Sequence, residues 1–144
     1  MAELSYAGLV SGVEAQLKAN MLLRGVQITQ ELDPPTEFPF VQVRLIRVTR
    51  RPYHIVAGLV SPGPDEVSVT LNLLCYEMSA QGAADAGRLR DALVSNVVDA
   101  IRTDPTLGSR VDYAVVTAID FAEEPGDAAI YAKAAITVQA TALA

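Results

Sequence analysis

The spacing of apolar residues along the chain predicts two helices. In the first segment they recur at steps of three and four, at Tyr6, Leu9, Val10, Val13 and Leu17. Ser5 precedes them as a candidate N-cap, so a helix is predicted to about Asn20. After Ser79, a second candidate cap, the same spacing holds for Ala86, Leu89, Leu93, Val97, Ala100 and Ile101. This helix is predicted to stop after Arg102, because Asp104-Pro105 cannot continue it.

Alternation of apolar and polar residues predicts strands in the segments between and after the helices. The clearest alternation covers residues 67–75, at Val67, Val69, Leu71, Leu73 and Cys75. Residues 111–121 and 130–139 show the same period. From residue 38 onward, Val41, Val43 and Leu45 are expected to be buried, and Arg44 to project from the other face.

Three further segments have less regular patterns of apolar residues. Residues 22–32 are expected to hold a strand with Val26 and Ile28 on one side, before Asp33-Pro34-Pro35 turns the chain. Residues 49–66 are expected to form a long loop or hairpin excursion with room for a short strand at residues 55–60. Its apolar residues either meet a partner or fold into the domain's own sheet. Residues 123–127 are expected to be a hairpin turn.

This order of elements predicts one α+β domain over residues 1–144, without internal repeats. Strands that follow one another through short turns favour a mixed, mainly antiparallel sheet. Both helices are then expected to pack on one face of the sheet, and the other face stays partly polar and open to a partner.

Composition narrows the class of protein. The chain has 144 residues, of which 51% are hydrophobic and 19% charged, enough apolar material for a core. The charge-free stretches are shorter than the roughly 18 apolar residues of a spanning helix, and the acidic start Met1-Ala2-Glu3 is unlike a secretory signal. We therefore expect no membrane association, and a chain that stays in the compartment where it is made. A single cysteine allows no intrachain disulfide.

Charge is acidic overall and unevenly placed. The net charge of -6 has the wrong sign for gripping a nucleic-acid backbone. Basic residues gather in a segment without acids, at Arg44, Arg47, Arg50 and Arg51, followed by Tyr53 and His54. Acidic residues gather late in the chain, at Asp120, Glu123, Glu124 and Asp127. These two groups are the candidate surfaces for a neighbouring subunit or a protein partner.

The residues of catalytic chemistry are sparse. His54 and Cys75 are the only histidine and cysteine, so no zinc site is expected. Cys75 lies in the inward phase of its strand, and Glu123 and Glu124 have no nearby base. The chain also lacks the glycine-rich phosphate-binding motifs and the nucleophile elbow. We expect no catalytic residue, no metal and no cofactor.

The order and spacing of these features resemble the tail terminator, or tail-completion, proteins of long-tailed bacteriophages, of the minor tail protein U type. The resemblance covers nearly the whole chain. Besides the N-terminal helix and the final hairpin, it rests on Phe38-Pro39-Phe40-Val41-Gln42-Val43, the strand from Val67 to Tyr76, and Asp104-Pro105-Thr106-Leu107-Gly108 after the long helix.

The resemblance implies a non-enzymatic virion protein, made in the host cytoplasm. Such proteins form a ring, typically a homohexamer, that caps the tail tube, stops its polymerisation and offers the head-joining surface. The implied partners are the tail tube protein and a head-completion or connector protein, and DNA passes through the ring without specific binding. A lumen that is acidic or neutral suits this passage. The alternatives are a neck or connector protein of the same virion, a small α+β ligand-binding module, and an enzyme that uses His54.

Overall fold

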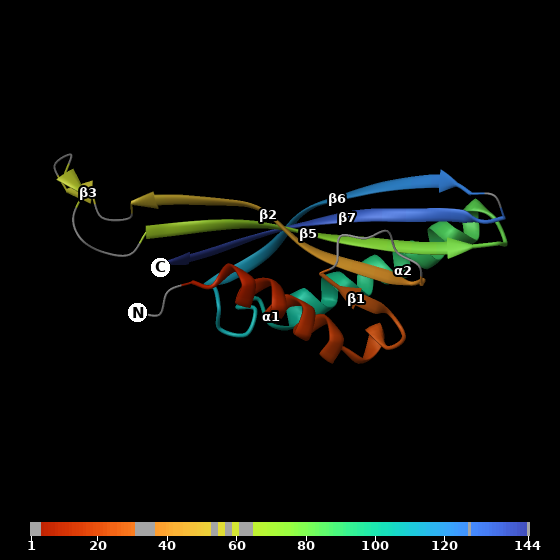
Figure 1. The fold of residues 1–144 in the computed structure, drawn as a ribbon, viewed down its shortest axis with the longest axis horizontal. Helices are drawn as coiled ribbons and strands as arrows, with labels where there is room; N and C mark the ends of the chain where they lie inside the picture. The colour runs from red at the N-terminus through yellow and green to blue at the C-terminus, as the bar shows by residue number, and fades with distance from the viewer. Residues whose placement is uncertain are drawn as a thin grey trace.

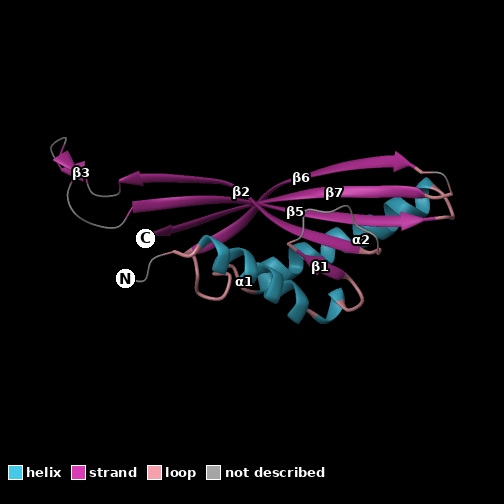
Figure 2. Ribbon diagram, in the orientation of Figure 1, coloured by secondary structure: helices cyan, strands magenta, loops and turns pink. Residues whose placement is uncertain are grey.

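The computed structural model describes residues 4–30, 37–52, 55–56, 59–60, 65–126 and 128–143. A long twisted sheet forms one layer, and the helices form a second layer along one side of it (Figures 1 and 2). This arrangement confirms the predicted α+β class with both helices on one face. The opposite face carries no helix from the described ranges, and we call it the uncovered face.

The five-stranded sheet has the order β1-β2-β5-β7-β6. Its strands are β1 (Gln27–Thr29), β2 (Phe40–Pro52), β5 (Asp65–Ser79), β6 (Tyr113–Pro125) and β7 (Ile130–Leu143). β1 runs parallel to β2, and every other neighbouring pair is antiparallel. The sheet is therefore mixed and mainly antiparallel, as the sequence predicts.

The two helices are α1 (Tyr6–Ala19) and α2 (Ala83–Thr103). The Ser5 cap is confirmed, because its hydroxyl accepts a hydrogen bond from the Gly8 backbone N–H at 3.0 Å. The Ser79 cap was wrong: Ser79 is the last residue of β5, and Gly82 holds the N-cap position with a φ of 115° that favours glycine. The Ser79 hydroxyl instead donates to the Asp85 carboxylate, in the first turn of α2.

Of the strand predicted at residues 22–32, only Gln27–Thr29 form a strand within the described residues 22–30. The described part forms a 3-10 helix, η1 (Met21–Leu23), and a β1 of only three residues. Asn20 explains the difference, because its side chain caps η1 by accepting from the Leu22 backbone N–H at 2.9 Å. Gly25 then turns the chain at a φ of 82°. The predicted turn at residues 33–35 lies outside the described residues.

Every described residue of the loop or hairpin excursion predicted at residues 49–66 lies in a strand. β2 continues to Pro52 and β5 begins at Asp65, and the two strands pair to their ends. Between them, β3 (Ile55–Val56) and β4 (Leu59–Val60) pair with each other in a separate two-stranded sheet. The predicted strand at residues 55–60 is thus a small hairpin, and it does not join the main sheet.

The turn predicted at residues 123–127 begins later. Glu123 and Glu124 belong to β6, where they pair with Ala132 and Tyr131 of β7. The described part of the turn closes through a hydrogen bond from the Gly126 N–H to the Ala129 carbonyl at 2.8 Å. Cross-strand pairing therefore outweighs the loop-like composition of these acidic residues.

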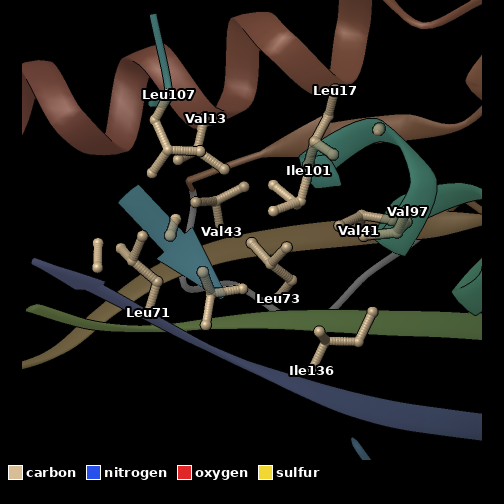
Figure 3. Close-up of a cluster of buried hydrophobic side chains, with 14 of the residues drawn as sticks. Val13, Leu17, Val41, Val43, Leu71, Leu73, Val97, Ile101, Leu107 and Ile136 are labelled. Carbon is tan, nitrogen blue, oxygen red and sulfur yellow. The ribbon is translucent and has the colours of Figure 1, made fainter. Parts of the chain in front are cut away.

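One hydrophobic core lies between the sheet and the helices (Figure 3). The inward residues of β5 and β7 alternate with half-exposed ones, which confirms the predicted alternation in both strands. Figure 3 shows α1 and the end of α2 above this face, with side chains from both layers meeting at Val13, Leu17, Val43, Leu73, Val97, Ile101 and Ile136. No helix of the described segments is long and apolar enough to cross a membrane.

Candidate functional site

Both edges of the sheet carry a long strand side without a partner in the described part of the chain. β6 is the outermost strand at one edge. At the other edge β1 pairs only with Phe40, Val41 and Gln42, so the rest of β2 has an open side. Open strand sides present backbone N–H and C=O groups that pair readily with another chain.

The open part of β2 is basic, and we call it the basic edge. Arg44 and Arg47 are exposed and form no ion pair with another described residue. Their cross-strand partners are Asn72 and Thr70, both on the uncovered face. Ile46 between them is a β-bulge, a common feature of sheet edges.

Arg50 and Arg51 lie further along β2, and partners within the chain hold both. The Arg50 Nε donates to the Tyr6 hydroxyl at 3.0 Å, and its terminal nitrogen lies 3.3 Å from the Asp65 carboxylate. The Tyr6 hydrogen bond is the main reason that the pKa of Arg50 is raised. Arg51 pairs with Glu66 at 2.7 Å. These two arginines therefore fasten β2 to β5 and to α1, which the sequence does not reveal.

The opposite edge, β6, is acidic, and we call it the acidic edge. Asp120, Glu123 and Glu124 are all exposed there. Glu124 forms an ion pair with Lys133 at 2.7 Å on the uncovered face, and Glu123 approaches Arg90 at 3.6 Å on the helix side. Asp120 forms no ion pair with another described residue.

Arg90 of α2 is a buried cation that the sequence analysis does not single out. It is 8% exposed. Its guanidinium lies 5.0 Å from the centre of the Phe121 ring and donates to the Ala122 carbonyl at 3.2 Å. Its burial could have been predicted from the sequence, because the helical spacing places Arg90 with Ala86 and Leu93 on the buried stripe of α2. Arg90 supports the acidic edge from below.

The structure therefore separates the two predicted charge groups instead of joining them. β5 and β7 lie between the basic edge and the acidic edge, so neither edge can contact the other within one copy. Tyr53, His54 and Asp127 lie outside the described residues. What the arrangement offers is one basic and one acidic strand side, on opposite margins of one molecule.

Exposed apolar side chains follow the same two strands. Of the eight large hydrophobic side chains that are exposed in the described part, five lie on β2 and β6: Leu45, Ile46, Tyr113, Val115 and Phe121. Leu45, predicted to be buried, is 36% exposed because no strand covers it at the open side of β2. Beside β6, a hollow of about 520 Å³ opens against α2 between Ile101, Pro105 and Val116. Apolar exposure of this kind marks an interaction surface.

The centre of the uncovered face is polar and uncharged. Its half-exposed side chains are Ser68, Thr70, Asn72, Thr137, Gln139 and Thr141. They bond one another across the strands, from the Thr70 hydroxyl to Gln139 at 3.2 Å and from the Thr137 hydroxyl to Asn72 at 3.4 Å. This surface offers no fixed charge that would hold a polyanion.

The described residues hold little catalytic chemistry. Cys75 is buried, and burial raises the pKa of its thiol to about 12, so it is protonated at neutral pH. Within the described ranges no group of three or more His, Cys, Asp or Glu side chains could hold a metal ion.

Comparison with known proteins relates the chain to others by fold. No protein-family model matches the sequence, and no curated protein matches it. Among solved structures, the chain is similar to a chain from the virion of a native gene transfer agent (GTA) particle, with a TM-score of 0.59 and 16% sequence identity. The match covers 97% of this chain and 100% of that chain. At this identity the similarity establishes a shared fold over nearly the whole length.

Proposed function

We propose that this protein is a structural component of a phage-like virion, in which copies form a ring that ends the tail tube. The observation that carries the proposal is the pair of open sheet edges, one basic and one acidic, on opposite margins of the molecule. The shared fold with a virion chain of a gene transfer agent supports it. We infer the tail-terminator role, and a homohexamer, from the order of elements that resembles tail terminators.

A ring of identical copies needs two different and complementary surfaces on each copy. The basic edge and the acidic edge satisfy this requirement, because each attracts the other and repels its own kind. The proposed partners above and below the ring are the tail tube protein and a head-completion or connector protein. The uncharged centre of the uncovered face suits a channel wall past which DNA moves without being retained.

Complementation of tail assembly tests this function. A phage or gene-transfer-agent system that lacks its own terminator, supplied with this protein, should yield tails of uniform length that join heads. Electron microscopy should place a ring of this chain at the head-proximal end of the tube. Tubes of uncontrolled length in the presence of well-folded protein would contradict the terminator role. A ring found on the head side, with tail length still uncontrolled, would favour a neck or connector protein.

A further inference from the structure

We propose that β6 of one copy pairs with the open side of β2 of the next copy, so that one sheet continues from subunit to subunit. This inference rests on the self-assembly in the proposed function and specifies its interface. It commits to a second copy of this chain as the partner of both edges. The mode is strand addition, in which backbone hydrogen bonds give affinity and side chains fix the register.

The sheet topology sets the direction of pairing. From β2 through β5 and β7 to β6 there are three antiparallel steps, so β6 runs opposite to β2. A neighbour related by rotation about an axis along the strands presents its β2 antiparallel to this β6. In that arrangement the helices of both copies stay on the same side of the joined sheet.

Charge on the uncovered face selects a register with Asp120 opposite Arg47 of the neighbour. These two side chains are exposed, of opposite charge and without an ion-pair partner among the described residues. Because Ile46 and Thr117 are bulged, neither takes a place in the ladder, and Arg44 then falls opposite Ala122. Arg44 thereby lies diagonally between Asp120 and Glu124, within reach of both carboxylates.

The same register joins apolar side chains on the helix side. Leu45 of the neighbour falls opposite Phe121, two residues that are 36% and 54% exposed in the single copy. Val48 falls opposite Ile119. Residues 43–51 of β2 and 115–123 of β6 would take part, so pairing would cover the exposed apolar residues of both edges except Tyr113.

The charges also exclude the wrong pairings. Two basic edges side by side would set Arg44 and Arg47 against their own copies, and two acidic edges would do the same for Asp120 and Glu124. Like charges directly opposite each other destabilise a sheet. The chain thus favours head-to-tail pairing, the arrangement that closes a ring, over symmetric dimers.

Site-directed cross-linking tests the interface directly. The double variant Thr49→Cys with Ala118→Cys, two exposed and uncharged residues that fall opposite each other in this register, should give a ladder that extends beyond dimers when treated with a short bismaleimide. Each single variant can give dimers at most, and Thr49→Cys with Ser95→Cys on the exposed face of α2 is the control for random collision. Cys75 is buried and stays unreactive in the folded chain. Absence of the extended ladder, in a protein that is folded by circular dichroism, overturns the inference.

Charge reversal gives an independent check. Arg47→Asp alone and Asp120→Arg alone should each weaken association at least about tenfold, since like charges then face each other. Combining the two reversals should restore association. If the double reversal associates no better than the single reversals, the proposed pairing of Arg47 with Asp120 is overturned. Tail length in complementation reports on the proposed function separately: correct tails without the cross-linked ladder leave the function standing and reject only this interface.

Discussion

Arg90 shows how one buried cation shapes the surface above it. Its stem lies in the apolar stripe of α2, and its guanidinium reaches the Phe121 ring, the Ala122 carbonyl and the Glu123 carboxylate. A residue of this kind stabilises by packing as well as by charge. These three contacts lie on consecutive residues of β6, and the Arg90 Nε also donates to Asp91 on α2 at 3.1 Å, so Arg90 ties this edge strand to the helix.

Replacing Arg90 should therefore lower stability. Arg90→Ala removes the packed stem and leaves the Ala122 carbonyl without its donor, and we expect a loss of about 2 kcal/mol in the free energy of unfolding. Arg90→Met keeps most of the stem and should lose about half as much. Urea denaturation followed by circular dichroism measures both. Equal stability of the alanine variant and the native chain would contradict the structural role of Arg90.

The Cys75 thiol should be inert in the folded protein. Burial and a pKa raised to about 12 leave almost no thiolate at pH 8, so a thiol reagent such as 5,5′-dithiobis(2-nitrobenzoic acid) should react only as the chain unfolds. Absorbance of the released thiolate, with and without denaturant, measures the difference. Rapid reaction of the native protein would place Cys75 at the surface.

At the scale of the element, the turn after α2 is held by one carboxylate. Asp104 accepts hydrogen bonds from the Thr106 hydroxyl at 2.6 Å, the Thr106 N–H at 3.1 Å and the Gly108 N–H at 2.9 Å. The Thr106 hydroxyl is the largest cause of the lowered pKa of Asp104, and the Gly108 N–H is the next. The bonds hold a tight segment in which Leu107, Gly108 and Ser109 all have positive φ.

The lowered pKa gives this turn a defined pH dependence. A carboxyl whose pKa is lower in the folded state stabilises the protein above its unfolded pKa, and this stabilisation is lost as pH falls through the folded pKa. Asp104→Ala should therefore lower the melting temperature at pH 7 and make less difference below about pH 3. Asp104→Asn keeps one acceptor oxygen, so its melting temperature at pH 7 should lie between those of the native chain and the alanine variant. A deficit that is the same at both pH values would show that the charge of Asp104 does not matter.

The sequence predicts the elements that have one buried and one exposed face. β5 and β7 are covered on one face only, so their alternation is visible, and α1 has both its apolar stripe and its Ser5 cap. Edge strands do not show this alternation clearly. The end of β2 is exposed and rich in arginine, and the end of β6 is acidic, so both resemble loops until their cross-strand partners are known.

The candidate surface was predictable in its residues and not in its geometry. The clustering of Arg44 and Arg47, and of Asp120, Glu123 and Glu124, is evident in the sequence. Their placement on opposite edges depends on the strand order, which non-local pairing determines. The intrachain ion pairs of Arg50 and Arg51 likewise depend on the β2–β5 register. The strand order and the ion pairs depend on contacts between segments that are distant in the sequence, so they are known only from the folded structure.

At the scale of the whole molecule, the charge asymmetry predicts that association weakens as salt is added. Exposed opposite charges attract over a Debye length of about 10 Å at 0.1 M salt and about 3 Å at 1 M. Interfaces that are partly polar are seldom obligate, so the free protein should be monomeric when dilute and form larger species when concentrated. Light scattering over a range of protein and salt concentrations measures both effects.

Neutralising the basic edge separates its electrostatic contribution from the rest of the interface. Arg44→Gln with Arg47→Gln should weaken association at low salt and flatten its salt dependence, because fewer charges remain to be screened. Arg24→Gln with Arg88→Gln, at exposed positions outside β2 and β6, is a matched control that removes the same charge elsewhere and should keep the native salt dependence. Apolar contacts at Leu45 and Phe121 should sustain residual association at high salt. An unchanged salt dependence in the β2 variant would show that Arg44 and Arg47 do not contribute to the association.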